Sequence, residues 1–133
     1  FEYTEKFVEI IYSNLMTTPT GLKSDIIDPE SHAKAGTPYL NNNEVIFKFG
    51  SIAITLDKLL LNSNAPNLID LLSLDVEGAE LEVLNGINHD KFKFKFICIE
   101  TRSFDTINEY LLKLNYKLEE KLTHHDYLFK YNN

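Results

Sequence analysis

One run, residues 69–87, constrains the fold of this chain more than any other stretch. Its first part is rich in leucine and ends abruptly in two acids, Asp75 and Glu77, and a glycine and a helix-period pattern follow. A buried strand that ends in carboxylates is typical of open α/β sheets, which hold their ligands at the carboxyl ends of their strands. The run therefore predicts an active-site edge, although it does not by itself name the reaction.

The elements predicted around this run alternate between helix and strand. The apolar periodicity and the turn residues predict a strand at 7–12, a long loop at 22–43 with a helical turn near 30–35, short strands at 45–49 and 51–54, a helix at 56–62 capped by Thr55, a strand at 69–74, a helix at 79–84, a strand at 94–99, a helix at 106–114, and a hairpin of 116–122 with 127–131. The alternation from residue 56 onward predicts an α/β fold with a mostly parallel sheet and an antiparallel last strand.

Composition limits the classes of function. A length of 133 residues fits a single domain, here 1–54 followed by an alternating helix and strand core at 55–133. The net charge of -7 disfavours nucleic acid as a partner, and the apolar runs are too short to span a membrane. Cys98 is the only cysteine, so no intrachain disulfide can form; a reducing, cytoplasmic location is expected.

Topology is expected to gather acids at one edge. Asp75 and Glu77 follow one predicted strand and Glu100 follows the next, and parallel strands end on the same side of a sheet. If 116–122 runs in the same direction, the turn after it reaches that edge too. The residues expected to share one crevice are then Asp75, Glu77, Glu100, His124, His125 and Asp126.

Three interpretations of Asp75 and Glu77 remain open at this point. They could be acid/base or orienting groups for a small substrate, or ligands of a metal ion together with Glu100 and a histidine. They could instead cap the following helix. His124 and His125 could form a solvated turn or supply a base. A metal-dependent hydrolase lacks a tight ligand signature here, so no metal site is expected.

Three blocks of the sequence resemble the FkbM-type methyltransferases. They are Ile-Ala-Ile-Thr-Leu-Asp at 52–57, the run Asp-Val-Glu-Gly-Ala-Glu inside 69–86, and Phe-Ile-Cys-Ile-Glu at 96–100. The resemblance implies a Rossmann-like class I sheet that uses S-adenosylmethionine to methylate a hydroxyl of a sugar, a lipid or a secondary metabolite. It also implies that 69–74 and 94–99 are the fourth and fifth strands of that sheet, and that the final hairpin is the sixth and seventh.

The resemblance implies roles for individual residues. Asp75 and Glu77 would line the site of the methyl donor and acceptor, Glu100 would lie beside the acceptor, and His125 or His124 would be a possible base. A weaker match places Ser13 and Asn14 near the adenine of the cofactor. The expected partner is a small-molecule or glycan acceptor.

The sequence also departs from that family. None of its five glycines forms a Gly-x-Gly pattern, so the cofactor loop that follows the first strand is missing. The chain therefore resembles a carboxyl-terminal portion of the fold that lacks the first strands, and a central apolar strand at 69–74 becomes an edge. We expect an amino-terminal segment, a second copy of the chain or the loop 22–43 to cover it. The alternative to an enzyme is a non-catalytic remnant that serves association or binds a small ligand.

Overall fold

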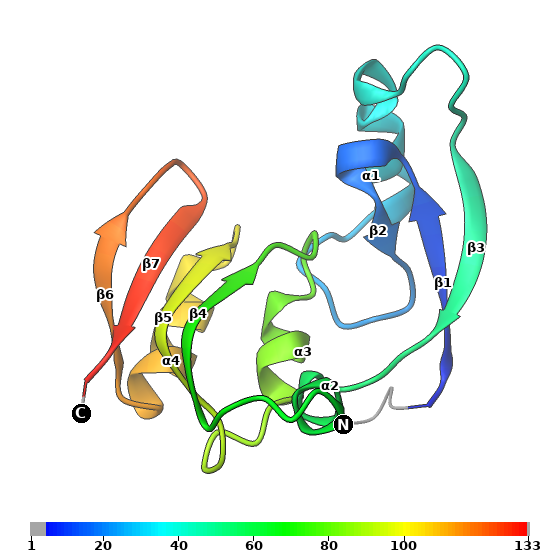
Figure 1. The fold of residues 1–133 in the computed structure, drawn as a ribbon. Coiled ribbons are helices and arrows are strands. Elements are labelled where there is room, and N and C mark those ends of the chain that lie inside the picture. Colours follow the sequence, from blue (N-terminus) through cyan, green and yellow to red (C-terminus); the bar gives the residue numbers. More distant parts are fainter. Residues whose placement is uncertain (1–4, 133) are drawn as a thin grey trace.

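The computed structural model describes residues 5–132, which form two β-sheets with helices between and beside them (Figure 1). The elements in chain order are β1 Phe7–Tyr12, β2 Thr18–Pro19, α1 Pro29–Ala35, β3 Phe47–Ile52, α2 Leu56–Asn62, β4 Leu68–Leu74, α3 Glu80–Asn85, β5 Lys93–Glu100, α4 Phe104–Lys113, β6 Tyr116–Lys121 and β7 Asp126–Tyr131. Within this range no helix has the length and apolar character that a membrane crossing requires.

The carboxyl-terminal sheet has the strand order β4-β5-β7-β6. β4 and β5 pair in parallel, whereas β7 pairs antiparallel with both β5 and β6. β4, β5 and β6 therefore point the same way, with β7 inserted against them, and the predicted final hairpin is confirmed. The prediction of a mostly parallel sheet is not confirmed. β4–β5 is the one parallel pairing in the described part of the chain, because the inserted β7 separates β6 from β5.

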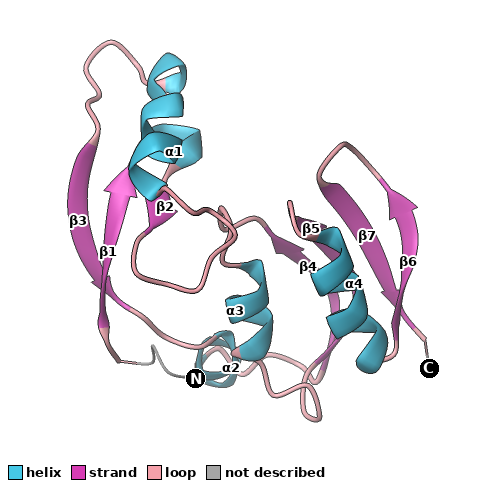
Figure 2. Cartoon of the chain, turned by 180° about the vertical axis from the view of Figure 1, so that it is seen from behind, coloured by secondary structure: helices cyan, strands magenta, loops and turns pink. Residues whose placement is uncertain are grey.

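α3 and α4 cover one face of this sheet and close the main hydrophobic core (Figure 2). Ile97 and Ile99 lie two residues apart on β5, so both side chains are on the same face of the sheet. They belong to one core cluster with Leu84 and Leu111, and all four are fully buried. Buried and less buried residues thus alternate along the second half of β5, as expected for a strand that packs one face against helices. The predicted position of β4 at the sheet edge is confirmed, because it pairs only with β5 among the described residues.

The amino-terminal sheet is wholly antiparallel, with the order β2-β1-β3. The prediction of two short strands around Gly50 is wrong, since β3 runs unbroken through that glycine. β1 pairs with every residue of β3, and Glu9 lies opposite Gly50. The ring of Phe7 occupies the place where a Cβ of residue 50 would lie, so the glycine allows close cross-strand packing and does not break the strand.

The two sheets meet at the turn that follows β4. The backbone N–H of Asp25 donates to the carbonyl of Gly78 at 3.1 Å, and the hydroxyl of Thr18 donates to the carbonyl of Glu77 at 3.4 Å. The ammonium of Lys58 in α2 lies 3.0 Å from the carboxylate of Glu5. The long loop thus reaches the carboxyl end of β4 and forms no strand pairing with its edge.

Candidate functional site

The turn between β4 and α3 has a strained backbone that its own sequence stabilises. Glu77 and Gly78 both have positive φ, 51° and 97°, and glycine takes that conformation without the steric cost of a Cβ. The carboxylate of Glu80 accepts hydrogen bonds from the N–H groups of Val76 and Gly78 at 3.2 and 3.0 Å. α3 begins after Ala79 with no side-chain cap, so the structure does not support a capping role for Asp75 or Glu77.

Glu77 is the electrostatic centre of this turn. Its side chain is only 13% exposed, and its carboxylate lies 3.1 Å from Nε2 of His32 in α1 and 3.4 Å from the guanidinium of Arg102. One carboxylate therefore links α1, the turn after β4 and the segment after β5. Sequence reasoning missed His32, because a lone histidine in a long loop has no periodic pattern that would single it out.

Four carboxylates gather at the carboxyl end of the parallel strands, and we call them the acid edge. They are Asp75, Glu77, Glu100 and Asp126. Partial burial raises the pKa of Glu100, and the negative charges of the other three raise that pKa further, while Arg102 opposes them. Glu100 also lies opposite Asp126 in the β5–β7 register. The four acids thus interact, while their roles in any reaction stay predictions.

The two histidines of the β6–β7 turn reach the same end of the sheet through their backbone. The N–H of Thr101 donates to the carbonyl of His125 at 2.9 Å, which fixes the turn beside the end of β5. The rings of His124 and His125 stack on each other with their centroids 4.7 Å apart. Their use as a base stays a prediction.

Ser13 and Asn14 have structural partners in the amino-terminal part of the molecule. Ser13 is fully buried, and its hydroxyl donates to the carbonyl of Ala33 in α1 at 2.5 Å. The amide of Asn14 donates to the carboxylate of Glu44 at 2.9 Å. These hydrogen bonds go to α1 and to Glu44, not to the acid edge, so the predicted contact of Ser13 and Asn14 with an adenine stays a prediction.

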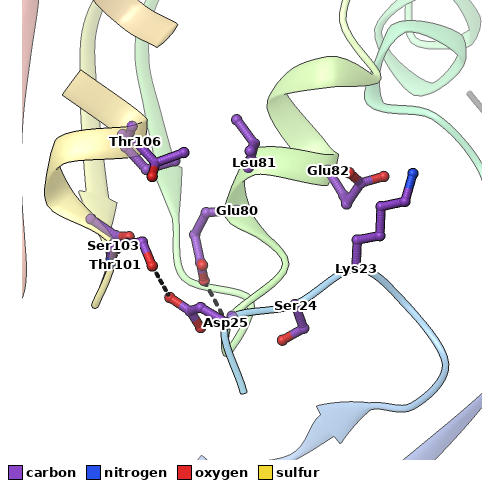
Figure 3. Close-up of a pocket in the computed structure, with 11 residues that line it drawn as sticks. Lys23, Ser24, Asp25, Glu80, Leu81, Glu82, Thr101, Ser103 and Thr106 are labelled. Atoms are coloured by element: carbon purple, nitrogen blue, oxygen red, sulfur yellow. Dashed lines mark hydrogen bonds between the residues drawn. The ribbon is translucent and has the colours of Figure 1, made fainter. Parts of the chain in front are cut away.

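A cavity of about 440 Å³ lies behind the acid edge, between α3 and α4 (Figure 3). We call it the α3–α4 cavity. Residues 23–25 of the long loop, the start of α3 and the start of α4 line it. Gly78 and Thr101 belong to this lining, and each comes directly after a member of the acid edge. The sequence predicted the edge but not the loop residues behind it, for which the length of the loop was the one available signal.

No group of three or more histidine, cysteine, aspartate or glutamate side chains in residues 5–132 is arranged to hold a metal ion.

A family model described as "Methyltransferase FkbM domain" matches residues 8–127 of the chain. A search of curated proteins found no match. A search of solved structures found none either.

Proposed function

Because the chain belongs to the FkbM methyltransferase family, whose model spans residues 8–127, we propose that it provides the acceptor side of a methyl transfer from S-adenosylmethionine to a hydroxyl group. The acceptor would be a sugar, a lipid or a secondary metabolite, as the resemblance implies. The observation that carries this proposal is the acid edge, where four carboxylates lie together and where partial burial, and then the neighbouring negative charges, raise the pKa of Glu100.

The residues present fit only part of a cofactor site. S-adenosylmethionine supplies an electrophilic methyl group when it is bound, and its methionine end needs a backbone that leaves room for it. At Gly78, whose φ is 97°, the side chains of Ser24, Asp25 and Ile26 already fill the space where a Cβ would be. Asp75 is exposed and could accept hydrogen bonds from the cofactor's hydroxyls. Residues 5–132 therefore do not by themselves form a complete site for the cofactor.

Each of three acid-edge residues has its own role on the acceptor side in this proposal. Glu100 takes up the proton that the acceptor hydroxyl loses, since a carboxylate with a raised pKa is a stronger base. Asp75 orients the hydroxyl from the end of the neighbouring strand. Glu77 is already held by His32 and Arg102, so it positions the turn and adds negative charge beside Glu100.

The test has two stages and uses the gene product that contains these residues. Calorimetric titration with S-adenosylmethionine should give a dissociation constant between about 1 µM and 1 mM, the usual range for enzyme substrates. Transfer of a labelled methyl group to a panel of hydroxyl compounds should then fall about 10²- to 10⁴-fold in Glu100→Gln, which is typical for loss of a general base. Asp90→Asn, at an exposed acid in the turn before β5, is the matched control and should keep full activity.

Two results would contradict the proposal. If no S-adenosylmethionine binds, the proposed methyl transfer is ruled out. If the cofactor binds and Glu100→Gln transfers methyl groups as fast as the parent, the acid edge is not the acceptor side.

One edge of β4 has no strand partner among residues 5–132, and this edge favours a second candidate, an association module without catalysis. Leu68 and Leu71 on this strand are 48% and 52% exposed, and an apolar edge strand pairs readily with another chain. Sedimentation of the purified chain tests this candidate. A stable dimer without cofactor binding would favour it, and a monomer that binds the cofactor would exclude it.

A further inference from the structure

A partly buried histidine that has no role in the proposed reaction connects α3 to α4, the two helices that cover one face of the carboxyl-terminal sheet (Figure 2). His89 follows the end of α3, and its Nε2 lies 2.8 Å from the carbonyl oxygen of Leu84 in the last turn of that helix. The hydroxyl of Tyr110 in α4 donates to the same carbonyl at 3.2 Å and lies 3.3 Å from Nε2 of His89. The two rings meet edge to face, with their centroids 5.9 Å apart. We call His89, Tyr110 and the Leu84 carbonyl the His89 cluster.

The hydrogen bonds of the His89 cluster suit the neutral imidazole. Because a carbonyl oxygen only accepts, Nε2 carries the hydrogen of the neutral ring. Nδ1 is buried and has no hydrogen-bond partner among the described residues. Protonation would place a second N–H donor and a positive charge at this buried position, and both are unfavourable without a partner. Neutral His89 thus fits between α3 and α4, whereas protonated His89 does not.

The charges that act on His89 do not compensate for its burial. Burial is the largest cause that lowers the pKa of His89 below the ordinary value of 6.5, and the hydrogen bond to Leu84 opposes it. The ammonium of Lys93 lowers this pKa further, and the carboxylate of Asp90 raises it. Asp90 is exposed, so water weakens its attraction for a protonated ring.

The charged side chains of the neighbouring helices are Asp57 and Lys58 in α2, Glu80 and Glu82 in α3, and Asp105, Glu109 and Lys113 in α4. Asp57 accepts a hydrogen bond from the N–H of Asn88, and Lys113 pairs with Glu109. Glu80 and Glu82 lie in the first turn of α3, at the opposite end of that helix from His89.

We propose that the His89 cluster is a pH-sensitive contact, in which neutral His89 holds the end of α3 against α4 and protonated His89 leaves this position together with the loop at 86–92. α3 has only six residues, which is less than two helical turns, and it begins at the turn of the acid edge. Loss of the contact therefore loosens the helix that begins at that turn, while the strand pairings of β5 remain. This contact does not depend on the proposed methyl transfer.

The direction of the pH effect follows from the lowered pKa of His89. The folded protein binds this proton less readily than the unfolded chain does. The contribution of the contact to stability is therefore complete above pH 6.5 and is lost as the pH falls through the lowered pKa. Protonation of Glu80 and Glu100 acts in the opposite direction, because their pKa values are raised. Loss of protection near the end of α3 on mild acidification is thus the sign expected for His89 and not for these two acids.

Amide hydrogen exchange, followed by NMR between about pH 8 and about pH 5, tests the proposal. After correction for the intrinsic rate, exchange at the N–H groups of Ile87 and Phe92, which are bound within this loop, should accelerate about tenfold as the pH falls. Exchange in β5 should not change. His89→Gln keeps a donor for the Leu84 carbonyl and takes up no proton in this range, so it should abolish the acceleration. His124→Gln, the same substitution at an exposed histidine, should leave the acceleration unchanged.

Unchanged exchange across this pH range, or the same acceleration in His89→Gln, would overturn the proposal. If His89→Gln does not fold, the ring signals of His89 in the parent protein decide. A ring titration with a midpoint below pH 6.5 that coincides with the acceleration supports the pH-sensitive contact. An acceleration at a pH where the ring is still neutral rejects it. Failure of S-adenosylmethionine to bind would leave these results unaffected.

Discussion

The two sheets of this molecule are stabilised in different ways. The carboxyl-terminal sheet buries Phe94, Ile97, Ile99 and Phe129 under α3 and α4. The amino-terminal sheet leaves all six residues of β3 exposed and buries fewer apolar side chains, among them Ile11 of β1 against Ala33 of α1. Beside it, three groups donate hydrogen bonds to Glu44. One sheet therefore depends on hydrophobic burial and the other on hydrogen bonds and on its attachment to the turn after β4.

The largest difference should appear when the same substitution is made in each sheet. Phe129→Ala removes a ring that is fully buried, and we expect it to cost about 3–5 kcal/mol of the free energy of unfolding. Phe49→Ala removes a ring that is 42% exposed and packs on Phe47, with a cost below about 1 kcal/mol. Urea denaturation measures both. Equal costs would mean that the amino-terminal sheet has an apolar core of its own.

A smaller effect is expected where the two sheets are joined. Gly78→Ala should cost about 2–3 kcal/mol, because an alanine at φ 97° is strained and its Cβ would meet Ser24 and Asp25. Gly21→Ala is the control, since φ there is 73° but no atom lies within 4 Å of the added Cβ, and it should cost about 1 kcal/mol. Urea denaturation gives both values, and amide exchange at Asp25 should accelerate only in Gly78→Ala. Identical effects of the two substitutions would show that the contact with the loop adds nothing.

Acidification should destabilise the amino-terminal sheet and stabilise the carboxyl-terminal sheet through their buried or hydrogen-bonded acids. Hydrogen bonds from the N–H of Asn41, the amide of Asn14 and the hydroxyl of Tyr12 lower the pKa of Glu44 from 4.5 to about 2. Its contribution to stability is therefore complete above the ordinary value of 4.5 and is lost as the pH falls toward about 2. The pKa values of Glu80 and Glu100 are raised, so their protonation on acidification favours the folded state of the other sheet.

An acid titration followed by two-dimensional NMR separates these effects. Signals of β1 should weaken at a higher pH than signals of β5, and Glu44→Gln should remove most of the pH dependence of β1. Tyr12→Phe, which keeps two of the three donors to Glu44, should lie between the parent and Glu44→Gln. Simultaneous loss of both sets of signals in all three proteins would refute independent stabilisation.

The same contrast explains which features the sequence could predict. Regular apolar spacing identified α2, β4, β5 and the final hairpin, and Thr55 caps α2 as expected, with its hydroxyl accepting from the N–H of Lys58. Spacing along the sequence does not encode the spatial order of strands. The insertion of β7 between β5 and β6 was therefore not predicted, and it is the reason why the sheet has fewer parallel pairings than expected. The edge position of β4 was an expectation from the family resemblance, and it is confirmed by the pairing of β4 with β5 alone among residues 5–132.

The acid edge could be predicted from the sequence, whereas the loop residues that line the α3–α4 cavity could not. Asp75, Glu77 and Glu100 come directly after apolar strands, so the rule that parallel strands end at one edge located them. Asp25 lies in an irregular loop and His32 in the short helix α1, and both reach the turn after β4 through tertiary contacts. No local pattern records such contacts, so only the length of the loop suggested a functional role.

The insertion of β7 has a consequence for how the chain is made. β5 and β6 have no strand pairing with each other, and in the sheet β7, residues 126–131, lies between them. A ribosome must therefore synthesise and release residue 131 before the sheet can close, and until then β5 has an open side that neighbouring nascent chains can contact. A premature stop codon between residues 122 and 126 would remove β7, a central strand of the sheet, and leave β6 with nothing to pair with.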